Sequence, residues 1–126
     1  MRWVRAEGMA AAAEQALPRW FTDEFRAANP DVMARYRQIA STCPLEGYIG
    51  ACAALRDADL RRDLHRITAP TLVVAGSKDV STTVADGAYL RDNIPEAWME
   101  VLEAAHLSNV ERPREFSELL ADFLFS

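Results

Sequence analysis

The chain has 126 residues and a formal net charge of −5, with half of its residues hydrophobic and 26% charged. This is the balance of a folded domain rather than of a disordered segment. It carries no Lys/Arg cluster fit for a phosphate backbone and no apolar run near the ~20 residues of a bilayer span, which argues against nucleic acid and membrane as partners. The first residues lack the apolar run of a signal peptide, so a cytoplasmic protein is expected.

Residues 1–66 are predicted to be helical and to form the first of two parts. Residues 9–17 are rich in strong helix formers, and Pro18 is expected to interrupt that helix. Thr22 is a suitable N-cap for the next helix. Cys43 and Cys52 fit no metal-site spacing and are predicted to be small buried thiols in helical segments. The remaining predicted helices cover residues 23–28, 31–41, 44–58 and 60–64.

Residues 67–126 alternate predicted strands and helices. Residues 71–76 form an apolar, β-branched run between Pro70 and Ser77, and residues 97–102 form a second strand candidate. One helix is expected from Thr82 or Thr83 to about residue 93, and another from Pro113 onward. This β-α-β-α order predicts a parallel sheet. The last helix is expected to bury the stripe Phe116, Leu119, Leu120, Phe123 and Leu124.

Two ionisable residues follow the two predicted strands. Asp79 comes three residues after Gly76, and His106 comes shortly after Leu102. Alone, such an Asp is often a turn former, and such a His is often an ordinary loop residue. Adjacent parallel strands, however, would bring both to one edge of the sheet. A carboxylate bonded to the histidine ring would fix its tautomer and prepare it as a general base near neutral pH.

Two segments carry a family resemblance. Residues 69–79, Ala-Pro-Thr-Leu-Val-Val-Ala-Gly-Ser-Lys-Asp, resemble the penultimate strand and acid loop of α/β hydrolases, and residues 104–113 resemble their histidine loop. Leu17-Pro18-Arg19-Trp20-Phe21-Thr22, residues 46–48 and residues 51–57 are similar to the 3-oxoadipate enol-lactonase group. The resemblance covers nearly the whole chain.

The resemblance implies the C-terminal part of an α/β-hydrolase fold, predominantly helical overall. Residues 1–66 would be a helical cap, truncated at its start, and residues 67–126 a β-α-β-α part of the core. It also implies hydrolysis of a small ester or lactone, the enol-lactone of the β-ketoadipate route of aromatic degradation, without metal or organic cofactor. Asp79 would be the triad acid and His106 the general base.

The resemblance also suggests residues that would face the substrate. Trp20 and Tyr48 are candidates in the cap, although aromatic residues at helical spacing are more often part of a core. Arg19 or Arg56 could meet a substrate carboxylate, because guanidinium matches that group, although surface solvation is the more common role.

The chain departs from the family pattern at the nucleophile. The family places a serine in Gly-x-Ser-x-Gly, and none of the five glycines here brackets a serine at that spacing. Ser77, Ser81 and Ser108 lie on no such elbow, so we expect little activity from these 126 residues alone. The alternatives are a non-catalytic helical oligomerisation module derived from a hydrolase, or a hydrolase of another ester. An unpaired edge on the strand at residues 71–76 would favour self-association.

Overall fold

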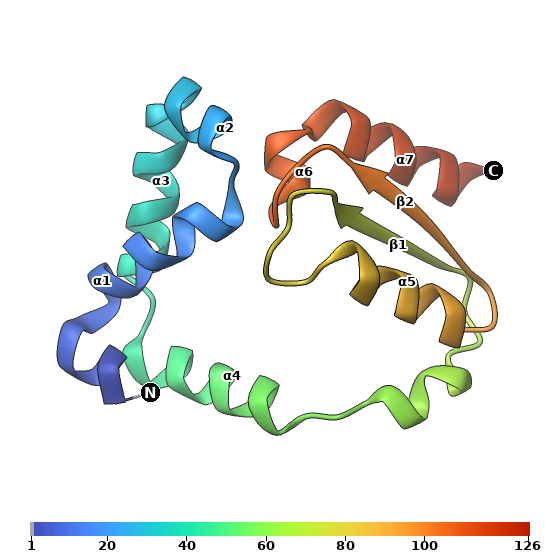
Figure 1. Cartoon of the computed structure of the whole chain (residues 1–126), viewed down its shortest axis with the longest axis horizontal. Helices are drawn as coiled ribbons and strands as arrows, with labels where there is room; N and C mark the ends of the chain where they lie inside the picture. The colour runs from blue at the N-terminus through green and yellow to red at the C-terminus, as the bar shows by residue number, and fades with distance from the viewer. Residues whose placement is uncertain (1) are drawn as a thin grey trace. The chain divides into compact units, whose positions relative to one another are not determined.

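The computed structural model describes residues 2–126, which pack as two units. One unit contains residues 2–18 and 23–59, and the other contains residues 19–22 and 60–126 (Figure 1). Residues 19–22 thus interrupt the first unit in sequence but pack with the C-terminal residues. The predicted division into a helical cap over residues 1–66 and a core part over residues 67–126 stays a prediction, and the two packing units have other boundaries.

The first unit consists of four helices: α1 (Arg2–Trp20, whose last two residues pack with the other unit), α2 (Asp23–Ala28), α3 (Pro30–Ser41) and α4 (Leu45–Asp57). The helices predicted for this region are present, but the predicted interruption at Pro18 is wrong, because α1 continues to Trp20. Pro18 removes one backbone donor close to the end of the helix, where little of the helix remains to be broken. The break in α1 lies at Gly8, whose φ of 81° glycine adopts readily.

Small and apolar side chains make the core of the first unit. Two ion pairs at its surface, Arg37 with Glu14 and Arg5 with Glu46, join α1 to α3 and α4. The predicted burial of the two thiols is wrong: Cys43 and Cys52 are half-buried, and Cys43 lies between helices α3 and α4. For Cys52 the reason is that α4, to which it belongs, contributes no buried residue. The buried residues of the unit are Val4, Ala12, Ala13, Ala16, Leu17 and Met33.

The second unit contains a two-stranded parallel sheet within the described residues, as the sequence predicted. In β1 (Thr71–Gly76) and β2 (Ala97–Leu102), Thr71 lies opposite Ala97 and Gly76 lies opposite Leu102. The 3-10 helix η1 (Arg61–Arg66) precedes the sheet, and α5 (Val84–Asn93) connects the two strands. The helix α6 (Ser108–Glu111) occupies part of a predicted loop, and α7 (Pro113–Phe125) follows it.

Helices lie on both faces of this sheet, with α5 on one side and α7 on the other (Figure 1). On the α7 side, the rings of Trp98 and Phe123 meet edge to face with centroids 6.2 Å apart. The predicted buried stripe on α7 is wrong, because α7 has no buried residue, and Leu120 and Leu124 are 42% and 60% exposed. Two strands offer too little surface to cover an amphipathic helix of this length.

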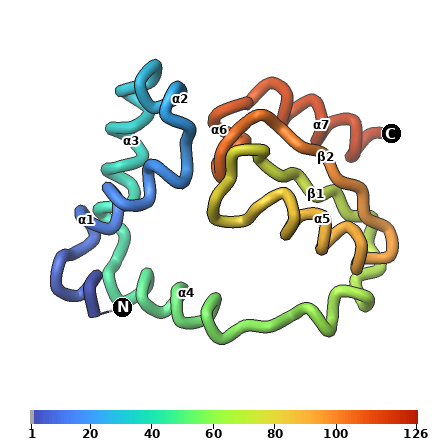
Figure 2. Tube along the Cα trace, viewed as in Figure 1, coloured from blue at the N-terminus to red at the C-terminus, as the bar shows by residue number. Residues whose placement is uncertain are grey.

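The two strands end side by side, because Gly76 at the end of β1 pairs with Leu102 at the end of β2. Figure 2 shows the chain leaving both strands at one end of the sheet. Residues 77–83 after β1 form the acid loop, and residues 103–107 between β2 and α6 form the histidine loop. No helix among residues 2–126 has the length and apolarity needed to cross a membrane.

Candidate active site

Backbone contacts bring the two loops together. The amide of Ser77 donates to the carbonyl of Leu102 at 2.8 Å, and that of Lys78 donates to Ala104 at 3.0 Å. Gly76 permits this approach, since a Cβ there would lie 2.4 Å from the carbonyl oxygens of both Ala104 and Ala105. The glycine that ends β1 is therefore a steric requirement of the histidine loop.

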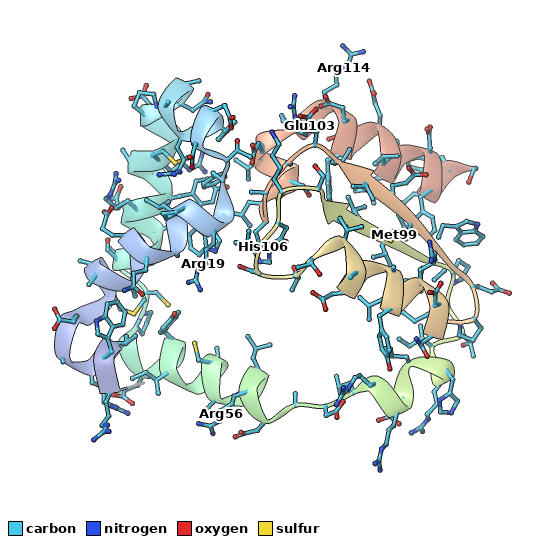
Figure 3. All side chains as sticks on the ribbon, viewed as in Figure 1. Arg19, Arg56, Met99, Glu103, His106 and Arg114 are labelled. Atoms are coloured by element: carbon cyan, nitrogen blue, oxygen red, sulfur yellow. The ribbon has the colours of Figure 1, made fainter. Side chains whose placement is uncertain are left out.

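Asp79 and His106 meet, as their positions after the two strands predicted. The ring Nδ1 of His106 lies 2.8 Å from Oδ2 of Asp79. The Asp79 side chain is 5% exposed, whereas that of His106 is 35% exposed. Figure 3 shows the labelled His106 side chain at the end of the sheet where the loops leave the strands. The carboxylate is thus enclosed, and the ring is partly open to an incoming group.

The Asp79 carboxylate receives three further hydrogen bonds from the acid loop. The amides of Ser81 and Thr82 donate to Oδ1 at 2.7 and 3.1 Å, and the Thr82 hydroxyl donates to Oδ2 at 2.9 Å. Burial alone would raise the pKa of Asp79, but the hydrogen bonds from His106, from the two amides and from the hydroxyl outweigh it and lower the pKa. Asp79 is therefore held as a carboxylate that accepts a hydrogen bond from the ring.

Thr82 contacts both members of the pair. Its Oγ1 lies 3.3 Å from Nδ1 of His106 in addition to its bond to Asp79. Both neighbours of Nδ1 are oxygens, and the charged carboxylate can only accept, so Nδ1 carries the proton and Nε2 is the basic nitrogen. Sequence reasoning considered Thr82 only as a possible helix cap. The capping residue is Thr83, which exchanges hydrogen bonds with Asp86 in a capping box.

The other predicted site residues are distributed over both units. Trp20 is half-buried, and its carbonyl accepts a 2.9 Å hydrogen bond from the amide of Leu107. Arg19 is exposed and lies in the same unit as His106. Tyr48 and Arg56 belong to α4 in the other unit, where Arg56 is paired with the adjacent Asp57. Contact of these residues with a substrate stays a prediction.

Solved structures define the class of protein. Over 98% of this chain, the structure matches the enol-lactonase from Burkholderia xenovorans LB400 with a TM-score of 0.95 and 39% identity, covering 47% of that chain. A hydrolase from Pseudomonas aeruginosa PA01 matches over 98% of this chain with a TM-score of 0.91 and 36% identity, and the match covers 46% of that hydrolase. No family model matches the chain. The chain has the fold of the C-terminal part of an α/β hydrolase and belongs to that superfamily.

Sequence relatives narrow the assignment. The chain is 43% identical over 114 residues to 3-oxoadipate enol-lactonase 2 of Acinetobacter baylyi, an alignment covering 90% of this chain and 43% of the relative. It is 38% identical over 123 residues to 3-oxoadipate enol-lactonase 1 of the same organism, covering 98% and 46%. Its homologues are thus 3-oxoadipate enol-lactonases, and it corresponds to their C-terminal portion. The chain spans less than half the length of these curated relatives.

Proposed function

We propose that this chain supplies the acid and the general base of a serine hydrolase that opens an enol-lactone in the β-ketoadipate route of aromatic degradation. The nucleophile would come from residues outside these 126. The observation that carries the proposal is the 2.8 Å contact between Asp79 and His106 at the matched ends of two parallel strands. The homology to enol-lactonases supports the choice of reaction.

The geometry suits proton transfer in both directions. With Nδ1 bonded to Asp79, Nε2 of His106 would accept the proton of a serine hydroxyl as that oxygen attacks the lactone carbonyl. The resulting imidazolium would be stabilised by the enclosed carboxylate, whose lowered pKa keeps it charged. The ring would then return the proton to the enolate oxygen that leaves when the lactone C–O bond breaks.

The substrate we propose is a small lactone that carries a carboxylate. Arg19 remains a candidate partner for that carboxylate, and Trp20 and Tyr48 remain candidate cap residues against the ring. The chemistry assigned to the pair requires no metal or organic cofactor. The cytoplasmic location expected from the sequence stays a prediction.

A hybrid enzyme tests the proposal. The chain would replace the matching C-terminal portion of the Acinetobacter baylyi enol-lactonase 2, and hydrolysis of the enol-lactone and of a p-nitrophenyl ester would be measured. Asp79→Asn should lower kcat about ten-thousand-fold and His106→Gln about a million-fold, as loss of the triad acid or base does in other hydrolases. His65→Gln, at the other histidine of the chain, is the matched control and should leave kcat unchanged.

Two outcomes would contradict this function. The first is a His106→Gln hybrid that retains the activity of the parent. The second is a hybrid that is folded by circular dichroism yet hydrolyses neither substrate, which would favour the non-catalytic module instead.

We also propose that the chain self-associates through β1. Within residues 2–126 the sheet has two strands, so only the edge of β1 that faces β2 is hydrogen-bonded to a strand. An uncovered strand edge is a template for pairing with another chain. Light scattering over a concentration series should give a mass above that of the 14.1 kDa monomer, and a monomeric mass throughout would contradict the proposal.

A further inference from the structure

The residues on either side of His106 are both hydrogen-bonded to groups outside the histidine loop. The amide of Ala105 donates to Oε2 of Glu111 at 3.1 Å, and the amide of Leu107 donates to the carbonyl of Trp20 at 2.9 Å. His106 is the one residue between these two anchored amides. The backbone that carries the ring is therefore fixed from both sides.

The Glu111 carboxylate connects the first anchor to the same distant segment as the second. Its Oε2 also accepts from the amide of Thr22 at 3.3 Å, and its Oε1 accepts from the Thr22 hydroxyl. Thr22 and Glu111 are 89 residues apart in sequence. Residues 20–22 thus hold Leu107 directly and Ala105 through Glu111.

Burial of Phe21, between the half-buried Trp20 and Thr22, makes residues 20–22 a firm support for these bonds. Phe21 is fully enclosed, at 0% exposure, and both Ala104 and Ala105 are buried, at 0% and 3%. Hydrogen bonds to a carboxylate are stronger than those between neutral groups, and they strengthen further where water is excluded. A glutamate on a short helix does not need protein partners of this kind. The three donors to the Glu111 carboxylate therefore indicate a specific structural role.

We propose that Glu111 is a positioning residue for the general base, coupling residues 20–22 to the histidine loop so that the His106 ring stays aligned with Asp79. The proposal deepens the proposed function, since it rests on His106 acting as the base. The Glu111 carboxylate accepts from Ala105 and Thr22, and it would act on the ring through the backbone. Without it, the Ala105 amide loses its acceptor, and of the two amides that flank His106 only that of Leu107 keeps its hydrogen bond to residues 20–22.

The test uses the 126-residue chain labelled with ¹⁵N, so it requires no turnover. Glu111→Gln keeps the size of the side chain but replaces one acceptor oxygen by an NH₂ donor. Amide exchange at Ala105 and Thr22 should accelerate roughly tenfold or more, the expected effect of losing a hydrogen bond to a charged group. The Nδ1–H resonance of His106, which reports its bond to Asp79, should broaden or vanish, while His65 serves as an internal reference.

Matched variants separate positioning from general destabilisation. Glu118→Gln removes a carboxylate of α7 that pairs with Arg114 at the surface, and it should leave the His106 signal unchanged. Thr22→Val removes only the hydroxyl donor to Glu111, and it should weaken the His106 signal, whereas Thr22→Ser should restore it. If Glu111→Gln does not fold, the Thr22→Val and Thr22→Ser pair decides the question.

The proposal is overturned if exchange at Ala105 accelerates while the His106 Nδ1–H signal stays sharp, because Glu111 would then support the loop without positioning the ring. It is also overturned if, in Thr22→Val, every amide of β1 and β2 accelerates together with Ala105, because the variant would then weaken the whole fold rather than the position of the ring. A failure of the proposed function would look different: the hybrid enzyme would tolerate His106→Gln, whatever the Glu111 variants do to the ring.

Discussion

Replacing Gly76 by Ala would drive a methyl group into the backbone of the histidine loop. The new Cβ would lie 2.4 Å from the carbonyl oxygens of Ala104 and Ala105, whereas real Cβ atoms essentially never lie closer than 3.0 Å to such atoms. The deficit of 0.6 Å falls on backbone atoms, which cannot rotate away as a flexible side chain can. Among residues 2–126, positive φ occurs at Gly8 and not at Gly76, so alanine meets no conformational barrier and the effect is steric.

The magnitude follows from two opposing terms. Overpacking a tight site costs roughly 1–3 kcal/mol, and removing the flexibility of a strand glycine returns roughly 0.5–1 kcal/mol. We expect a net loss of about 1–2 kcal/mol in the free energy of unfolding of the second unit. The carbonyls that must move are close to His106. A displacement of about 1 Å in a catalytic group can lower the rate a hundredfold. The kcat of the hybrid enzyme should therefore fall by a larger factor than the loss of folding stability alone would cause.

Urea unfolding monitored through the exchange of β1 and β2 amides would measure the loss of stability, and enol-lactone hydrolysis would measure the fall in kcat. Gly50→Ala is the control, and it should raise stability rather than lower it. A Cβ at Gly50 meets nothing within 4 Å, and the residue lies inside α4. It should stabilise its helix by about 0.5–1 kcal/mol. A Gly76→Ala chain as stable as the parent, with an unchanged His106 Nδ1–H signal, would refute the steric reasoning.

Three further predictions follow from the site. Thr82→Val in the hybrid should lower kcat about tenfold with little change in KM, and Thr82→Ser should recover most of it; equal kcat values for the Val variant and the parent would exclude a role for the hydroxyl. Because the pKa of folded Asp79 is lowered, its stabilising contribution is complete above the ordinary Asp value of about 3.9 and is lost as pH falls through the lower folded value. Urea unfolding between neutral pH and about pH 2 should show that loss, and Asp79→Asn should remove that component; superimposable pH profiles would count against it. A fluorophosphonate probe should label no serine in the 126 residues alone, and a labelled Ser77, Ser81 or Ser108 would show a nucleophile that the sequence did not reveal.

The strands were predictable because their signals are local. An apolar run ending at Gly76 and a second run after Pro95 define β1 and β2 without reference to the rest of the chain. The pairing of Asp79 with His106 followed from the general rule that parallel strands deliver their loops to one edge. The 3-oxoadipate enol-lactonase resemblance, read from short motifs, is confirmed by the relatives.

Predictions that depended on surroundings were less successful. The periodicity of α7 marks a face that is suited to burial, but burial requires a partner surface, and Leu124 remains 60% exposed. The roles of Thr82 and Glu111 depend on contacts across 24 and 89 residues, which no local pattern encodes. A glutamate five residues after the histidine was visible in the sequence, but its partner Thr22 became evident only when the chain was folded.

In the part of the chain that the structure describes, the hydrogen bonds that orient the Asp79 carboxylate come from Ser81, Thr82 and His106, all in the second unit. Within residues 2–126, the Asp79–His106 pair is therefore assembled by residues of the second unit. Changes in α2, α3 and α4, which lie wholly in the first unit, need not rebuild the pair. Under the proposed function, such a division would let the substrate change while the acid and the base keep their positions.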